Sequence, residues 1–204
     1  MVAALTAAIV LTYAAFWFAP EGVQNSIDYA FALIPSRFDP ASPDHFNAWW
    51  EAIGPVFGHT FLHAAWWHAG LNAFFFYATG RIPALRLGWA RFLALYLFSA
   101  AIGALLFVAL NWGEQTAAIG ASDAVCGVFM AYFFSVRPSW RQSLAIPAVR
   151  NQIGVIVLVN VVLMGVLTEF GVFPIAWEGH LGGFIGGALA YIALEPRRRA
   201  GPWG

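Results

Sequence analysis

The stretch "GHLGGFIGG", residues 179–187, places a titratable histidine inside an apolar segment that is rich in glycine. On a helix, Gly183 and Gly187 follow His180 at i+3 and i+7 and therefore lie close to its face. That face carries no bulky side chain, and two glycines four residues apart let a neighbouring membrane helix approach closely. The stretch therefore predicts a buried helix that packs tightly on another helix, with His180 beside the contact.

A second stretch, "AIGASDAVCG" at residues 118–127, sets Ser122 and Asp123 in a similarly apolar context. The chain of 204 residues around both stretches is 61% hydrophobic and only 10% charged, whereas a soluble domain carries about 25% charged residues. The formal net charge is +0, so the basic footprint of a nucleic-acid-binding protein is absent from the sequence. Composition therefore predicts an all-α, polytopic membrane protein in a lipid bilayer, with one domain over residues 1–204.

A membrane-crossing helix needs about 20 mostly apolar residues. Six predicted spans meet this need, over residues 2–19, 58–79, 88–111, 118–136, 152–170 and 177–194. The segment 20–57 holds several prolines and acids and is too polar to cross, yet it is rich in aromatic residues. We expect it to form an external loop whose short helices lie at the lipid headgroups.

Charge predicts the orientation of the spans. Nine of the ten basic residues flank or fill the connections after the second and fourth spans or lie in the tail 195–204. They are Arg81, Arg86, Arg91, Arg137, Arg141, Arg150, Arg197, Arg198 and Arg199. By the positive-inside rule this side is cytoplasmic. Both termini are then expected in the cytoplasm, and the membrane is expected to be a bacterial inner membrane.

Polar residues gather in the outer half of the predicted bundle, because spans two, four and six all enter from the outer side. His68 and Asn72, then Ser122, then His180 thereby reach a similar depth. Intramembrane ionisable groups are costly and usually mark function. An imidazole in hydrogen-bond reach would activate the Ser122 hydroxyl as a nucleophile. The N–H groups at the start of its helix would favour developing negative charge.

Three motifs resemble those of the rhomboid family of intramembrane serine proteases. "FLHAAWWHAGLN" is similar to the family's second-span pattern, with a leading histidine followed by His-x-x-x-Asn. "GASDAVCG" resembles the nucleophile motif Gly-x-Ser-Gly, and "GHLGGFIGG" resembles the sixth-span motif His-x-x-Gly-x-x-x-Gly. The order and spacing of the motifs agree with the family over residues 2–194. The resemblance implies a six-transmembrane-helix, rhomboid-like bundle.

The resemblance also implies an activity, namely endopeptidase cleavage of another protein's single transmembrane span, without cofactor or metal. Ser122 would be the nucleophile and His180 its general base. The oxyanion of the transition state would be bound by His68, Asn72 and the Ser122 N–H. The remaining implied roles are site lining and water retention by His63, a close turn at Gly120, and packing of spans four and six at Gly183 and Gly187.

Two features depart from the family pattern. Asp123 follows the serine where the commonest pattern has glycine, and neighbouring residues on a helix are about 100° apart, so we expect its carboxylate to point away from His180. The stretch "EAIGPVFGHTFLH", residues 51–63, lacks the Trp-Arg pair that many bacterial members carry before the leading histidine. The external loop must therefore be stabilised by other contacts.

Three alternatives stay open. A catalytically inactive rhomboid-like protein could bind transmembrane clients, although such relatives typically lack the serine or the histidine. A proton relay could use His63, His68, Asp123 and His180, but no repeated pair of broken spans supports a transporter. A metal site of three histidines is disfavoured because no carboxylate second shell is evident and helical spacing turns His63 about 140° from His68. The sequence leaves the oligomeric state undetermined.

Overall fold

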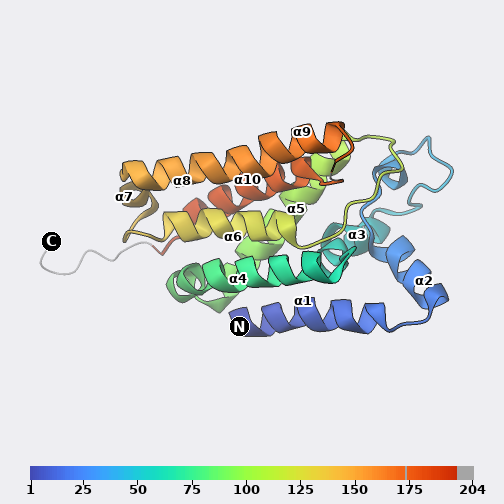
Figure 1. Ribbon diagram of the computed structural model, residues 1–204, viewed down its shortest axis with the longest axis horizontal. Helices are drawn as coiled ribbons and strands as arrows, with labels where there is room; N and C mark the ends of the chain where they lie inside the picture. The colour runs from blue at the N-terminus through green and yellow to red at the C-terminus, as the bar shows by residue number, and fades with distance from the viewer. Residues whose placement is uncertain (173, 197–204) are drawn as a thin grey trace, which may run out of the picture.

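The computed structural model describes residues 1–172 and 174–196, which form a bundle of helices (Figure 1). Its elements are α1 Val2–Trp17, α2 Glu21–Phe31, η1 Pro35–Phe38, η2 Trp49–Ala52, α3 Ile53–Gly58, η3 His59–Phe61, α4 Trp66–Leu87, α5 Trp89–Leu110, α6 Ser122–Phe134, α7 Trp140–Leu144, α8 Pro147–Val157, the π-helix η4 Leu158–Leu163, α9 Met164–Glu169 and α10 Trp177–Leu194. Most of the predicted tail, including Arg197, Arg198 and Arg199, lies outside the described residues.

The long helical segments run between the two ends of the molecule in the order that the predicted spans have along the chain. They are α1, α4, α5, α6, the continuous unit α8–η4–α9, and α10 (Figure 1). The short elements α2, α3, η1, η2 and η3 gather at one end, and α7 lies at the other. Over the described residues, 1–172 and 174–196, the structure is therefore an all-α bundle, as predicted.

The outward faces of the helices carry large apolar side chains. Leu11 is 66% exposed, Leu85 85%, Leu105 57% and Val155 60%. Such a surface is unusual in water and suits a lipid environment. Among the described residues, two helical segments, Trp89–Leu110 and Pro147–Glu169, are long and apolar enough to cross a membrane by length and composition alone. Val2–Trp17 and Ser122–Phe134 are apolar but shorter.

Helix α10 packs on both α5 and α6, and its glycines make both contacts possible. A methyl group at Gly182 would lie 2.7 Å from the Gly103 Cα on α5. A methyl group at Gly183 would lie 2.0 Å from the backbone oxygen of Asp123 on α6, and one at Gly187 2.3 Å from the Gly127 Cα. The structure thus brings the predicted fourth and sixth spans into backbone contact at the glycines that the sequence singled out.

The predicted second span, 58–79, differs from the helix found. Helix α4 begins only at Trp66, after Ala65 in an extended conformation, and continues through Pro83 to Leu87. The segment before it folds into short helices instead, because tertiary contacts hold it: a methyl group at Gly58 would lie 2.4 Å from the Phe31 ring. At the other end the helix stops at Gly88, whose φ of +78 is a positive backbone angle that favours glycine.

Helix α6 is too short to cross a membrane alone. Its 13 residues span about 20 Å, against a hydrocarbon core of about 30 Å. The preceding chain, predicted as part of the span, is extended: Leu33 and Ala118 exchange two backbone hydrogen bonds of 3.1 and 2.9 Å, and the Gly120 N–H donates to the His59 carbonyl at 2.8 Å. These bonds satisfy the irregular backbone, which permits it inside the bundle. Ser122 therefore starts its helix within the protein.

The external loop is held by contacts around Arg37 rather than by the missing Trp-Arg pair. The buried Arg37 guanidinium lies between the Tyr29 ring at 4.4 Å and the Phe46 ring at 4.3 Å. It donates a hydrogen bond to the Tyr29 carbonyl, and the Phe46 N–H donates to the Arg37 carbonyl at 2.8 Å. A cation between two aromatic faces ties α2 to the chain beyond η1.

Candidate active site

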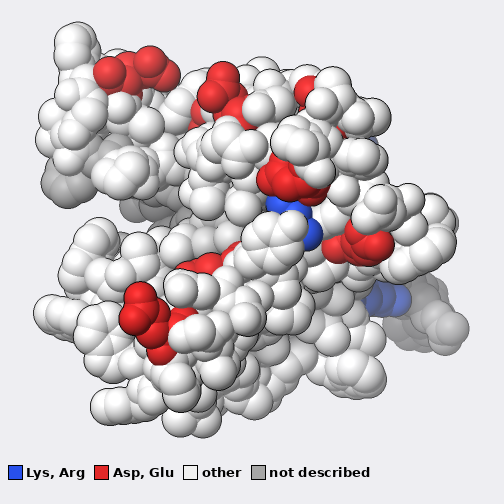
Figure 2. All heavy atoms as spheres, turned by 90° about the vertical axis from the view of Figure 1, so that its right-hand side faces the viewer, with Lys and Arg blue, Asp and Glu red and all other residues white. Residues whose placement is uncertain are grey.

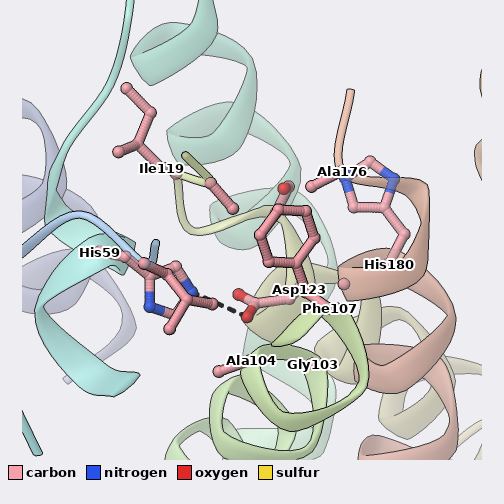
Figure 3. A pocket seen from close by; sticks show the side chains of 13 residues that line it. His59, Gly103, Ala104, Phe107, Ile119, Asp123, Ala176 and His180 are labelled. Carbon is pink, nitrogen blue, oxygen red and sulfur yellow. Dashed lines mark hydrogen bonds and ion pairs between the residues drawn. The ribbon is translucent and has the colours of Figure 1, made fainter. Parts of the chain in front are cut away.

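Ser122 and His180 line the same small cavity, although 58 residues separate them. Ser122 is the first residue of α6 and His180 lies in the first turn of α10. The cavity has a volume of about 20 Å³ and is also lined by Gly120, Asp123 and Gly179. It has room for about one water molecule. Ser122 is half-buried and His180 is buried, and Figure 3 shows His180 at the edge of this cavity. The glycine contacts between α6 and α10 thus bring a hydroxyl and an imidazole to one site.

The His180 ring has a defined orientation. Its Nδ1 lies 3.2 Å from the backbone carbonyl oxygen of Asn160, in the π-helical turn η4. A ring nitrogen pairs with a carbonyl only by donating, so Nδ1 is assigned the proton and Nε2 keeps its lone pair. π-Helical turns often occur at functional sites. The neutral imidazole in this tautomer is a base at Nε2.

Gly120 brings the second-span residues against the serine loop. It has φ +118, and a methyl group here would lie 2.7 Å from Cε1 and 2.8 Å from Nε2 of His68. The same methyl group would lie 3.8 Å from Nδ2 of Asn72, whose amide donates to the His68 carbonyl at 3.1 Å. Glycine is required because both the backbone angle and the His68 ring exclude a side chain. Gly120, two residues before Ser122 in sequence, therefore brings the side chains of His68 and Asn72 next to the serine loop.

His63 does not face away from His68, contrary to the prediction from helical spacing. Its ring centroid lies 4.9 Å from that of His68 in an edge-to-face arrangement. The prediction was wrong because His63 precedes α4 and is not helical. Its Nε2 accepts from the Ala121 N–H at 3.5 Å, and its buried Nδ1 has no hydrogen-bond partner among the described residues. His63 thus supports the backbone immediately before Ser122.

The structure adds a site residue that the sequence analysis passed over. His59, in η3, places its Nε2 3.0 Å from the Asp123 carboxylate, and both residues are buried. Figure 3 shows the carboxylate of Asp123 directed toward His59 rather than His180. The available signal was the need of a buried aspartate for a partner, together with a further histidine in "GHTFLH". Within the described residues, no group of three or more His, Cys, Asp or Glu side chains could hold a metal ion.

These observations define a class: an all-α bundle with a lipid-facing exterior and a polar site that contains a serine and a histidine. The comparison with protein families gives one that fits this class, since the model described as "Rhomboid domain" matches residues 47–197. The chain belongs to the rhomboid family. It is therefore an integral membrane protein of a family made up mostly of serine intramembrane proteases, with some inactive homologues. The comparison with curated proteins finds no match.

Proposed function

We propose that this chain is an intramembrane serine endopeptidase whose catalytic residues are Ser122 and His180. The observation that carries the proposal is the shared cavity, in which the Asn160 carbonyl holds Nδ1 of His180 and leaves Nε2 as its free nitrogen. A serine hydroxyl becomes a competent nucleophile when a base within reach accepts its proton. The buried surroundings keep bulk water from competing for that proton.

The reaction follows from these two side chains. Nε2 of His180 accepts the Ser122 proton while Oγ bonds to the substrate carbonyl carbon, and the imidazolium then protonates the leaving amine as the peptide C–N bond breaks. Water, deprotonated by the same nitrogen, attacks the acyl-enzyme and releases Ser122. The Asn160 carbonyl continues to accept from Nδ1–H, which stabilises the transient imidazolium.

Stabilisation of the oxyanion is assigned to three groups on the other side of the serine. The Ser122 N–H lies at the positive end of α6, where unpaired backbone donors favour negative charge. His68 and Asn72 border Gly120 and supply side-chain donors. Preorganised donors of this kind stabilise the tetrahedral intermediate.

The proposed substrate is the transmembrane segment of another protein, in the simplest case a single-span protein. The exterior of the bundle faces lipid, and Ser122 starts a helix that is too short to reach both membrane surfaces. A peptide bond in a regular helix has its carbonyl hydrogen-bonded, so the segment must unwind near its outer end to present that bond. We place the site in the outer half of a bacterial inner membrane, with both termini in the cytoplasm.

Covalent labelling of the detergent-solubilised protein tests this proposal. A serine-directed fluorophosphonate should label the parent chain, and mass spectrometry should locate the adduct on Ser122. Ser122→Ala should remove the label completely. A label that persists in Ser122→Ala would reject this nucleophile, and an unlabelled parent chain would favour an inactive, client-binding protein.

A further inference from the structure

The buried pair of His59 and Asp123 lies directly beside the nucleophile. Nε2 of His59 contacts Oδ2 of Asp123 at 3.0 Å, while Oδ1 accepts from the Ala124 N–H at 2.6 Å. The other ring nitrogen, Nδ1, donates to the Pro55 carbonyl at 2.7 Å. Asp123 is 4% exposed and His59 3%. Every polar atom of both side chains therefore has a partner, and α3 is connected to the first turn of α6.

His59 holds the chain on both sides of Ser122. Its backbone carbonyl accepts from the Gly120 N–H at 2.8 Å, and its ring binds Asp123. Ser122 lies between these two fixed points. A change at His59 would consequently alter both the direction of the serine side chain and the direction of its backbone N–H.

Helix α5 provides the space for this pair. A methyl group at Gly103 would lie 2.6 Å from Cβ and 2.7 Å from Oδ2 of Asp123. Gly103, Ala104 and Phe107 of α5 line the same cavity as His59 and Asp123 (Figure 3). In such apolar surroundings a buried ion pair is strongly coupled, and the loss of one partner leaves the other uncompensated. His59 also offsets a carboxylate charge that would otherwise oppose an oxyanion near Ser122.

We propose that His59 and Asp123 are positioning residues for the nucleophile, acting as a linked pair where the common family motif has glycine after the serine. The pair holds the first turn of α6 so that the Ser122 Oγ and N–H meet the substrate carbonyl together. This role rests on the proposed protease function. It distinguishes the pair from an ion pair that only adds stability, because it predicts an effect on turnover in folded protein.

Kinetics of single and double variants test the role. His59→Ala, Asp123→Ala and the double variant are assayed on a model single-span substrate, with kcat expressed per site titrated by fluorophosphonate. We expect each single change to lower kcat about 10–10²-fold, the scale of a small misplacement of a reacting group, with KM changed less than about 3-fold. The double variant should be no slower than the slower single variant, because coupled residues are not additive.

Conservative variants and a matched control complete the design. The glutamine of His59→Gln can still donate to the Asp123 carboxylate, and the asparagine of Asp123→Asn can still accept from the His59 ring. Both variants should therefore keep kcat within about 5-fold of the parent. They test the role even if the alanine variants fold poorly. His45→Ala, a change at an exposed loop histidine, should leave kcat unaltered. Thermal unfolding is recorded for every variant, so that loss of stability is separated from loss of turnover.

The outcomes are distinct. Alanine variants that unfold earlier but keep the parent kcat would overturn the positioning role, and so would single effects that add in the double variant or glutamine and asparagine variants as slow as alanine. A parent chain that neither cleaves nor becomes labelled would reject the proposed function itself, and the positioning role with it. Coupling between His59 and Asp123 would then still be visible in thermal unfolding alone.

Discussion

At the scale of single residues, the site is explained by the cost of placing polar groups inside an apolar bundle. Ser122, His180 and Asn72 lie among helices whose other buried residues are almost all apolar. Polar groups in such surroundings need hydrogen-bond partners, and two of these side chains have one on the backbone: His180 at the Asn160 carbonyl and Asn72 at the His68 carbonyl. Each partner fixes one atom of the side chain and leaves another available for chemistry.

Asn72→Ala tests the assignment of an oxyanion donor. We expect kcat to fall about 10²–10³-fold, the usual cost of losing one such donor, with little change in KM because the interaction forms in the transition state. Steady-state kinetics on a single-span substrate measure this. Unaltered turnover would show that Asn72 only packs against His68 and Gly120.

The sequence predicted which residues gather at the site better than it predicted how they are held. The motifs around Ser122 and His180 indicated a meeting of two helices, and Gly183 indicated how close they come. A buried aspartate signals that it needs some partner, but the sequence does not identify that partner as His59, because no periodicity relates a histidine to an aspartate 64 residues later. His63 was misplaced for a related reason: a helical spacing was applied to a residue that lies before the helix.

At the scale of elements, backbone contact between α10 and α6 brings the proposed catalytic side chains of Ser122 and His180 to one cavity. We expect Gly183→Ala to destabilise the protein by about 1–3 kcal/mol, the usual cost of overpacking, and to abolish most activity, since its methyl group would overlap the Asp123 backbone. Thermal unfolding and substrate cleavage in the same detergent provide the measurement.

Gly154→Ala is the matched control for this substitution. Gly154 lies in α8 with nothing within 4 Å of the added methyl group, and alanine in a helix is more stable than glycine by about 0.5–1 kcal/mol. Its melting temperature should be equal to or above that of the parent, with activity retained. Equal losses in both variants would mean that the close α6–α10 contact is not the cause of the loss at Gly183.

The helix boundaries show where the apolar pattern of the sequence is sufficient to predict the ends of a helix. Helices α5 and α10 agree with the predicted residues to within one position at each end, since each is one long apolar run. Helices α4 and α6 start later than predicted, at Trp66 and Ser122. Their preceding residues are apolar enough for a span, but backbone hydrogen bonds with the external loop take them out of the helix. Such tertiary contacts are absent from the local pattern.

At the scale of the whole molecule, charge is separated between the two ends of the bundle. Figure 2 looks onto the end that carries α2 and α3, where acidic side chains are spread over the surface. The arginines at the end of α4, at the start of α5 and in α7 and α8 occur at the other end. Because arginine-rich ends are retained in the cytoplasm, this separation supports the proposed orientation, in which the cavity of Ser122 lies near the outer surface.

Cysteine labelling tests this orientation. The single native cysteine, Cys126, is buried, so the parent chain should stay unlabelled by a membrane-impermeant maleimide added to bacterial spheroplasts. Glu51→Cys in the external loop should be labelled from outside, and Arg150→Cys in α8 only after the membrane is permeabilised. Both positions are exposed. Labelling of Arg150→Cys from outside, with Glu51→Cys labelled only after permeabilisation, would show that the topology is the reverse of the one proposed.

The account as a whole depends on hydrolysis of a transmembrane substrate by Ser122 with His180 as its base. The most direct measurement is incubation of the purified protein with a model single-span substrate in detergent or proteoliposomes, followed by gel electrophoresis and mass spectrometry of the products. The parent chain should produce one cut near the outer end of the span. Ser122→Ala and His180→Ala should produce none, although thermal unfolding should show that both variants are folded. Cleavage at the parent rate by either variant, or an intact substrate with the parent chain, would contradict the account.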